Sequence, residues 1–374
     1  MKKRAQQIYR EVLTETLWGY AEKKFRGLEE LFEKTREENP KRPPVFLREL
    51  GHNNVLLSKT AGGALRNQVL NQIPKEKWHK WFSSMMSSQA LAQSVFGNLK
   101  ALGKLTCLWG LIGDDRKPLF IRIRDNFDKF EMEKNIDYLG ERRMTSVDVF
   151  FGGEYQIAVE CKLSEPEVGT CSRPRLLRTD PTYEREYCDG RYAIQGERGK
   201  RCALTELGIR YWDNAYIPRF FKADQWSPDE DHSPCPMKKT YQLVRNILAA
   251  GLSSAPRHGN GEIVHETGGH VVLLYDARNP EFQKEGEGTS AYNEVKNGLL
   301  NKSLLQKCTW QQVIVAMKAD PELAWLVEAL GEKYGLVPES EAYDGNNSHG
   351  PDQISGSRWA RSQMGKAISR DCFR

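Results

Sequence analysis

The sequence predicts a mixed α/β protein in which helices flank a central β-sheet, and three stretches carry this prediction. Residues 145–163 (TSVDVFFGGEYQIAVECKL) have the composition of two short strands joined by a Gly152-Gly153 turn. Residues 270–275 form an unbroken apolar run, which is typical of a buried parallel strand. Residues 237–251 carry apolar side chains every three or four positions, as expected of a helix that packs on a sheet.

Length and composition describe a globular protein with one large or two ordinary domains. The chain has 374 residues, of which 39% are apolar and 28% charged. No run approaches the roughly 20 apolar residues of a membrane span. The N-terminus is basic but lacks an apolar signal segment, so we expect a cytoplasmic protein with no membrane partner. In that reducing compartment its eight cysteines suit metal binding or catalysis better than disulfides.

The two predicted strands bring an unusual set of charges together. Side chains alternate along a strand, so Ile157, Val159 and Cys161 should face a core, with Ala158, Glu160 and Lys162 on the other face. The turn returns Asp148 to the same neighbourhood. Two carboxylates and an ammonium on a rigid sheet suit the binding of a divalent cation against a phosphate. The alternative is an amphipathic ribbon on which Glu160 and Lys162 form a solvated pair.

Asp148 with Glu160-Cys161-Lys162 resembles the catalytic motif of the PD-(D/E)xK nuclease superfamily, and thus implies a restriction-endonuclease-like mixed sheet. Val147 stands where that family often has proline. The resemblance implies Mg²⁺ or Mn²⁺ held by Asp148, Glu160 and the backbone carbonyl of Cys161. It also implies that Lys162 orients or deprotonates a water, or stabilises the transition state. An upstream acid often completes such sites, and Glu141 or Glu133 is available here.

Other segments extend this resemblance. In the RecB-like branch a glutamine on the helix after the Glu-x-Lys strand points at the active site, and Gln242 resembles it, although Asn246 stands where a tyrosine is usual. SSQALAQSVFGNL, GIRYW and YQLVRN are similar to segments of bacterial restriction-endonuclease-like proteins, so the resemblance covers most of residues 45–335. Glu22-Lys23-Lys24 and Glu294-Val295-Lys296 also fit Glu-x-Lys, but both lie in helix-like sequence without an acid on a partner strand.

The chain divides into three predicted regions: a mainly helical region 1–80, a nuclease core 81–337 with an insertion at 164–240, and a polar tail 338–374. Residues 1–38 should form a packed helical segment rather than a partner-binding arm. Residues 85–102 should form a helix that Ser83 or Ser84 caps and Gly103 ends. Strands are expected at 119–124 and 129–133, and helices at 292–307 and beyond.

The predicted insertion is rich in arginine and tyrosine. Between residues 173 and 222 eleven basic residues stand against seven acidic ones. Interleaved aromatics (Tyr187, Tyr192, Tyr211 and Trp212) suit phosphate contacts combined with base stacking. The alternative is a long solvated loop, which would be unusual inside a compact domain.

Cys171, Cys188, Cys202 and Cys235 are the candidates that would organise this insertion. Their sequence neighbours are mostly polar, unlike those of core cysteines. Thiolates bind Zn²⁺ or a [4Fe–4S] cluster, and related nucleases of the RecB and Cas4 kind carry such a cluster. No C-x-x-C occurs, so the spacing does not identify a metal, and His232 could replace one thiolate. Scattered thiols without a metal are the alternative.

These observations favour a Mg²⁺-dependent deoxyribonuclease that acts in phage restriction or DNA repair, with RNA as the other possible substrate. Protein partners or self-association are compatible with the sequence. One alternative is a non-catalytic nucleic-acid-binding or assembly protein on a nuclease-like scaffold. Another is a metal-binding adaptor that docks a partner through its N-terminal helix. No GxxxxGK[ST] phosphate loop is present, so the sequence shows no NTPase motif.

Overall fold

The fold is taken from a computed structural model. It describes residues 2–120, 129–139, 141, 144–173, 179, 188, 190–191, 202–204, 209, 211–213, 215–226, 234–256, 262–266 and 268–338. In this part of the chain, no helix is both long enough and apolar enough to cross a bilayer.

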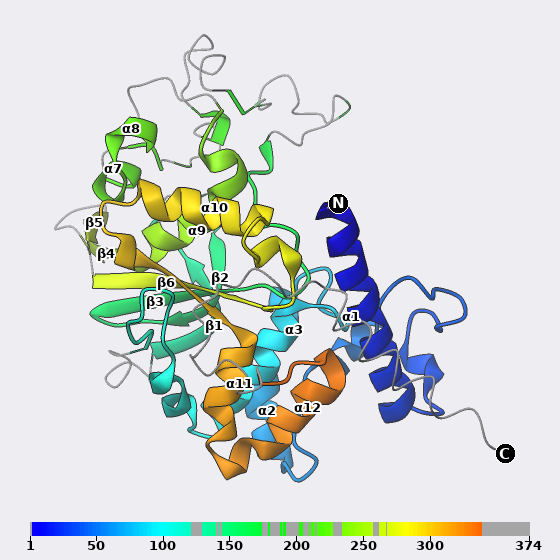
Figure 1. Cartoon of the computed structure of the whole chain (residues 1–374). Coiled ribbons are helices and arrows are strands. Elements are labelled where there is room, and N and C mark those ends of the chain that lie inside the picture. Colours follow the sequence, from blue (N-terminus) through cyan, green and yellow to red (C-terminus); the bar gives the residue numbers. More distant parts are fainter. Residues whose placement is uncertain are drawn as a thin grey trace, which may run out of the picture.

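A five-stranded mixed sheet lies at the centre of the molecule, with strand order β1-β2-β3-β6-β7 (Figure 1). Its strands are β1 (Phe130–Ile136), β2 (Thr145–Phe151), β3 (Tyr155–Cys161), β6 (Gly268–Tyr275) and β7 (Leu305–Thr309). β1, β2 and β3 form an antiparallel meander, whereas β6 is parallel to both β3 and β7. A separate antiparallel pair joins β4 (Leu252–Pro256) and β5 (Glu262–Glu266). The predicted hairpin and the predicted buried parallel strand are both confirmed.

Helices cover both faces of this sheet (Figure 1). The α-helices are α1 (Lys2–Lys24), α2 (Gly63–Leu70), α3 (Ser88–Ala92), α4 (Asn98–Ala101), α7 (Ile217–Phe220), α8 (Ala223–Trp226), α9 (Met237–Gly251), α10 (Glu287–Gly298), α11 (Trp310–Lys318) and α12 (Ala324–Tyr334). A π-helical turn, Gln93–Gly97, joins α3 to α4. Short 3-10 turns are η1 (Glu29–Leu31), η2 (Arg48–Asn54), η3 (Lys75–Lys77), η5 (Leu105–Gly110), η10 (Pro280–Phe282), η11 (Lys302–Leu304) and η12 (Pro321–Leu323).

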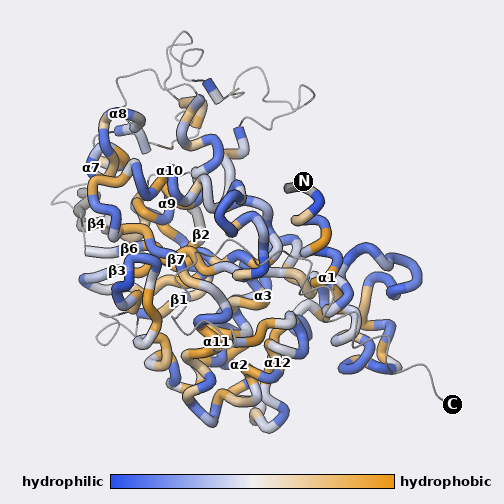
Figure 2. Tube along the Cα trace, in the orientation of Figure 1, coloured by the Kyte–Doolittle hydropathy of each residue, from blue (hydrophilic) through white to orange (hydrophobic). Residues whose placement is uncertain are grey.

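Alternation along β3 separates two hydrophobic cores. Val159 and Cys161 pack in the core that contains Phe96 of the π-helical turn and Val313 of α11. Ala158 packs in the other core, with residues of α9 and α10. Figure 2 shows hydrophobic residues concentrated along α11 and the strands. The predicted two-faced pattern of residues 157–161 is therefore confirmed, and the face of Glu160 is the one that α9 covers.

Two local predictions were wrong. Ser87, not Ser83 or Ser84, caps the helix at residue 88, because its side chain accepts a hydrogen bond from the amide of Ala90. The backbones of Ser83 and Ser84 instead pair with residues 45–46. The helix predicted at 292–307 ends at Gly298, and 305–309 form β7, since pairing with β6 satisfies their backbone groups.

The N-terminal helix α1 is packed against the rest of the molecule, as predicted, but it ends at Lys24 and does not extend to residue 38. Leu13 and Leu17 are buried in the first core. The Tyr9 hydroxyl lies 2.9 Å from both the carbonyl oxygen of Leu163 and Oδ2 of Asp276, and Gln6 donates to the Ser164 carbonyl over 3.1 Å. These bonds fix α1 to the segment that follows β3.

A buried lysine on α12 supplies a test of the packing. Lys333 is 1% exposed, and its ammonium donates to the backbone and side-chain oxygens of Asn54 over 2.5 and 2.7 Å. Burial lowers the pKa of Lys333 to about 7. In the unfolded chain the same lysine keeps a pKa of about 10.4. Between pH 7 and about 10 the unfolded state therefore binds more protons than the folded state, so the free energy of unfolding rises with pH in this range.

We therefore expect the free energy of unfolding of the wild type to rise, relative to that of Lys333→Met, by a few kcal/mol from pH 7 to about 10. Denaturant unfolding at several pH values measures this difference. Lys318→Met, on the exposed face of α11, is the control and should show no such trend. A difference between wild type and Lys333→Met that stays flat with pH would show that burial does not shift this group.

Candidate functional site

Three carboxylates form a row across the antiparallel meander. Met132 pairs with Val149 and Lys134 with Val147, so Glu133 stands opposite Asp148. Val149 pairs with Val159, and one residue further along this register Glu160 stands opposite Asp148. Residues directly opposite each other point to the same face of a sheet. The register thus brings acids of β1, β2 and β3 to one face.

Lys162, the first residue after β3, adds an ammonium group to this row of carboxylates. Its ammonium lies 2.8 Å from Oε1 of Glu160 and donates to Oε1 of Gln242 over 3.1 Å. Its backbone is fixed on both sides, by the carbonyl of Leu274 (2.7 Å) and the indole of Trp310 (2.9 Å). Burial by itself would lower the pKa of Lys162, but the adjacent carboxylate of Glu160 outweighs it and raises that pKa above its ordinary value. Lys162 is therefore an ammonium at neutral pH.

Asp148 is held by the backbone of β3. Its Oδ2 accepts the amide of Cys161 over 2.7 Å. Burial raises the pKa of the Asp148 carboxyl well above its ordinary value, and the charges of Glu160 and Glu133 raise it further. The side chain of Cys161 packs in the opposite core, so this residue presents only its backbone to the acids.

Glu133 occupies a strained position in β1. Its φ of 48° lies in the left-handed region, which costs a residue other than glycine about 1–3 kcal/mol. The amide of Gln89 donates to its Oε1 over 2.6 Å, and its carbonyl accepts from Lys77 over 2.8 Å. Burial raises the pKa of Glu133, and the nearby charge of Glu160 acts in the same direction. Backbone strain retained beside a cluster of charges is typical of functional sites.

Helix α9 supplies two amides to the same face. Gln242 accepts a hydrogen bond from Lys162, so its side chain faces the row of charges and not solvent. One helical turn later Asn246 is fully buried and donates to Oε2 of Glu160 over 2.7 Å. In the sequence, Asn246 stands out only as a departure from a family pattern. Its four-residue spacing from Gln242, which puts both on one helix face, was the available signal.

Glu141 lies elsewhere. Its carboxylate accepts hydrogen bonds from the hydroxyls of Tyr211 and Tyr241, the second over 3.3 Å. It is not among the described side chains that line the cleft around Asp148. Of the two upstream acids that the sequence offered, the structure brings Glu133 and not Glu141 to Asp148 and Glu160.

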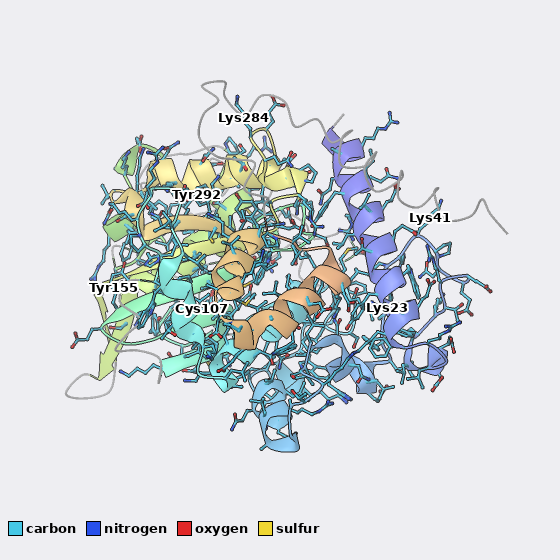
Figure 3. The ribbon with its side chains drawn as sticks, turned by 60° about the horizontal axis from the view of Figure 1, so that its bottom comes forward. Lys23, Lys41, Cys107, Tyr155, Lys284 and Tyr292 are labelled. Atoms are coloured by element: carbon cyan, nitrogen blue, oxygen red, sulfur yellow. The ribbon has the colours of Figure 1, made fainter. Side chains whose placement is uncertain are left out.

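These groups line a large cleft with a volume of about 1410 Å³. It exceeds the roughly 300–1,000 Å³ typical of small-molecule pockets. Around this floor, residues 10–42 contribute Arg10, Lys34, Lys41 and Arg42 against Glu11 and Glu33, and Lys77 and Glu165 add one further charge of each sign. Lys41 lies beside α1 in Figure 3, across the molecule from Tyr155 at the start of β3. The cleft therefore has an acidic floor on the sheet and a mainly basic rim.

The oxygen donors on the floor of the cleft suit a hard divalent cation. Carboxylate and carbonyl oxygens are the ligands of Mg²⁺ and Mn²⁺. Burial raises the pKa of Asp148 and of Glu133, and the charge of Glu160 acts in the same direction on both. Among the described residues, no three His, Cys, Asp or Glu side chains already stand at metal-ligand spacing. Glu160 is turned instead to Lys162 and Asn246.

Outside the cleft, the four cysteines of the predicted insertion line one small pocket.

The aromatic residues that were predicted to stack on bases have a different outcome. Tyr211 and Trp212 are 1% and 7% exposed and pack on Tyr241 and Trp226, so the expectation that they stack on bases was wrong. Their apolar area is buried in the core beneath α9. Tyr187, Tyr192 and His232 lie outside the described residues.

A family model described as "Restriction Endonuclease associating with ARP" matches residues 19–335. The match spans the sheet, α9 and every acid of the cleft floor. Comparison with the curated proteins and with the solved structures gives no match.

Proposed function

Since the chain belongs to the family of restriction endonucleases associating with ARP, we propose that it is a metal-dependent nuclease that hydrolyses the phosphodiester bonds of DNA. One observation carries this proposal: Asp148, Glu160 and Lys162 meet on one face of the sheet, at the floor of a cleft with a basic rim. Restriction is the role that the family description names, and DNA repair would use the same chemistry.

Asp148, Glu160, Glu133 and the Cys161 carbonyl are the oxygen donors that would hold Mg²⁺ or Mn²⁺. Such an ion polarises a phosphate oxygen and lowers the pKa of a bound water. Without it, three carboxylates share one buried region, and burial, together with the charges of the neighbouring carboxylates, raises the pKa of Asp148 and Glu133. The acids thus supply a negative site whose charge a cation would balance.

Lys162 acts in this proposal as a charged group rather than as a base. Because Glu160 holds it as an ammonium, it can stabilise the negative charge that develops on the phosphate. Gln242 fixes the position of its nitrogen, and Asn246 fixes the carboxylate of Glu160. Both amides are neutral, so they orient the charged groups without changing the net charge of the floor.

The rim explains how a polyanion would enter a cleft with an acidic floor. Its five cations outnumber its three carboxylates and can contact phosphates on either side of the scissile bond. Arg245, which donates to the carbonyl of Ser146 over 3.0 Å, adds a cation on the α9 side. Binding is therefore expected to weaken steeply with salt, as for other phosphate-dominated contacts.

The test uses the full chain with Mg²⁺ or Mn²⁺ on single-stranded, duplex and branched DNA and on RNA. We expect metal-dependent cleavage of at least one DNA substrate and its loss with a chelator. Cleavage of RNA alone would change the substrate class. Binding of DNA without cleavage under all these conditions would support the non-catalytic alternative.

A further inference from the structure

Four cysteines that are far apart in the sequence come together at one point of the fold. Cys171, Cys188, Cys202 and Cys235 line a single small pocket, and the first three are each only 8% exposed. The structure pairs none of the cysteines that it describes in a disulfide. The other described cysteines, Cys107, Cys161 and Cys308, do not line this pocket. The four sulfurs do not stand at metal-ligand spacing in the structure, but four thiols that line one pocket without disulfide bonding are the ligand set of a closed metal site.

Backbone amides point at two of these sulfurs. The amide of Gly190 donates to Sγ of Cys188 over 3.3 Å. The backbone of Arg173 makes the equivalent bond to Cys171, again from two residues further along the chain. A neutral thiol is a weak acceptor, whereas a thiolate accepts such bonds strongly. Hydrogen bonds to the sulfurs are also the usual second layer of a metal–thiolate site.

Burial raises the pKa of the Cys171 thiol to about 12, and the charge of Arg173 acts in the opposite direction. The side chains of Arg173 and Lys238 line the same pocket, and Arg173 is 8% exposed. Cys235 lies two residues before the start of the 15-residue helix α9, next to its N-cap Pro236, and the N-terminus of a helix carries partial positive charge. Four thiolates on a divalent ion leave a net charge of −2, which these two cations balance.

We propose that Cys171, Cys188, Cys202 and Cys235 hold one Zn²⁺ ion as a closed, structural site. The pocket has a volume of about 10 Å³, which is room for about one atom-sized occupant. This size favours a single ion over the eight atoms of a [4Fe–4S] cluster. Binding would release the four thiol protons to solvent, with no change of oxidation state, and the side chains would turn inward to reach the ion.

Such a site would anchor α9 and the segment after β3 to each other. The amide of Cys171 donates to the carbonyl of Lys238 over 3.1 Å, and the amide of Gln242 donates to that of Gly169 over 3.3 Å. Gly169 has a φ of 109° and lies so close to the Gln242 side chain that a Cβ there would overlap it. The ion would thus fix the first turns of α9, from which Gln242 reaches Lys162.

Metal analysis of the purified full chain tests the site independently of any nuclease activity. We expect one zinc per chain in the wild type, and its loss in Cys171→Ser, Cys188→Ser, Cys202→Ser and Cys235→Ser. Cys308→Ser and Asp148→Asn are the controls and should retain the zinc. Metal-free wild-type protein, even after reconstitution with Zn²⁺, would overturn the proposal. So would iron with a visible iron–sulfur absorption band.

X-ray absorption at the zinc edge identifies the ligand atoms around zinc in the wild-type protein, so this test does not depend on whether the cysteine variants fold. The expected result is four sulfur neighbours at roughly 2.3 Å and no nitrogen or oxygen neighbours. A first shell with nitrogen or oxygen would contradict a site built from these four cysteines. Nuclease activity plays no part in either readout, so the zinc proposal and the nuclease proposal can fail separately.

Discussion

Asp148→Asn, Glu160→Gln and Lys162→Met are each expected to lower the rate of Mg²⁺-dependent DNA cleavage by about 10²–10⁴-fold. Each substitution keeps the approximate shape of the side chain and removes its charge. Asp148 and Glu160 would lose a ligand charge toward the cation, and Lys162 would lose the ammonium that faces the phosphate. Single-turnover cleavage of a labelled duplex measures the effect.

The chain supplies its own matched control. Glu294-Val295-Lys296 repeats the Glu-x-Lys spacing on α10, and Lys296 there forms an ion pair with Asp114 over 2.9 Å. Neither Glu294 nor Lys296 lines the cleft in the described part of the chain. Glu294→Gln and Lys296→Met should therefore cleave at the wild-type rate. Equal loss in both sets would point to general damage, and wild-type cleavage by any of the first three variants would exclude the assignment.

A stability measurement separates chemistry from folding in these variants. The pKa of Asp148 is raised because burial and two like charges destabilise its ionised form. Without a metal, neutral asparagine removes that repulsion at pH 7, so Asp148→Asn should unfold at the same or a higher temperature than the wild type. Addition of Mg²⁺ should stabilise the wild type and not the variant. A variant that is both inactive and unfolded would say nothing about catalysis, which is why the two readouts are taken together.

The parts of the fold that depend on local pattern could be predicted from the sequence. Alternation along residues 156–163 is enough to separate Glu160 and Lys162 from Val159 and Cys161, because side-chain direction in a strand has period 2. The register between strands is not local. It decides that Glu133 stands opposite Asp148, and nothing in the sequence near Glu133 states which residue of β2 it will meet. Glu141 is closer to the hairpin along the chain, yet Tyr211 and Tyr241 bind it.

Tertiary pairing explains the other differences. Residues 305–309 form a strand because their backbone groups pair with those of β6. A stretch of five residues carries too little periodicity for the sequence to predict a strand there. Tyr211 and Trp212 lie in a polar stretch of sequence but are buried under α9. The four cysteines have no diagnostic spacing, and only the return of the chain at Cys235 brings them to one pocket.

Glu133→Gln is expected to reduce Mg²⁺-dependent cleavage by about 10²-fold or more, while Glu141→Gln stays close to the wild type. Glu133 shares the cleft floor with Asp148 and Glu160, whereas the Glu141 carboxylate binds two tyrosine hydroxyls outside the cleft lining. Glu133→Gly serves as a second variant, since glycine adopts a φ of 48° without strain and also lacks the carboxylate. Equal cleavage by Glu133→Gln and the wild type would remove Glu133 from the site.

The pH dependence gives this prediction a readout that a purely structural role would not move. Protonation of Asp148 removes a charge that the cation needs, so cleavage should fall as the pH drops through its raised pKa. Because the charge of Glu133 is one of the causes that raise this pKa, Glu133→Gln should shift the acid limb of the pH–rate profile to lower pH. A variant that merely loosened β1 would lower the rate at every pH and leave the limb in place. The position of the limb therefore reports whether Glu133 and Asp148 share one electrostatic site.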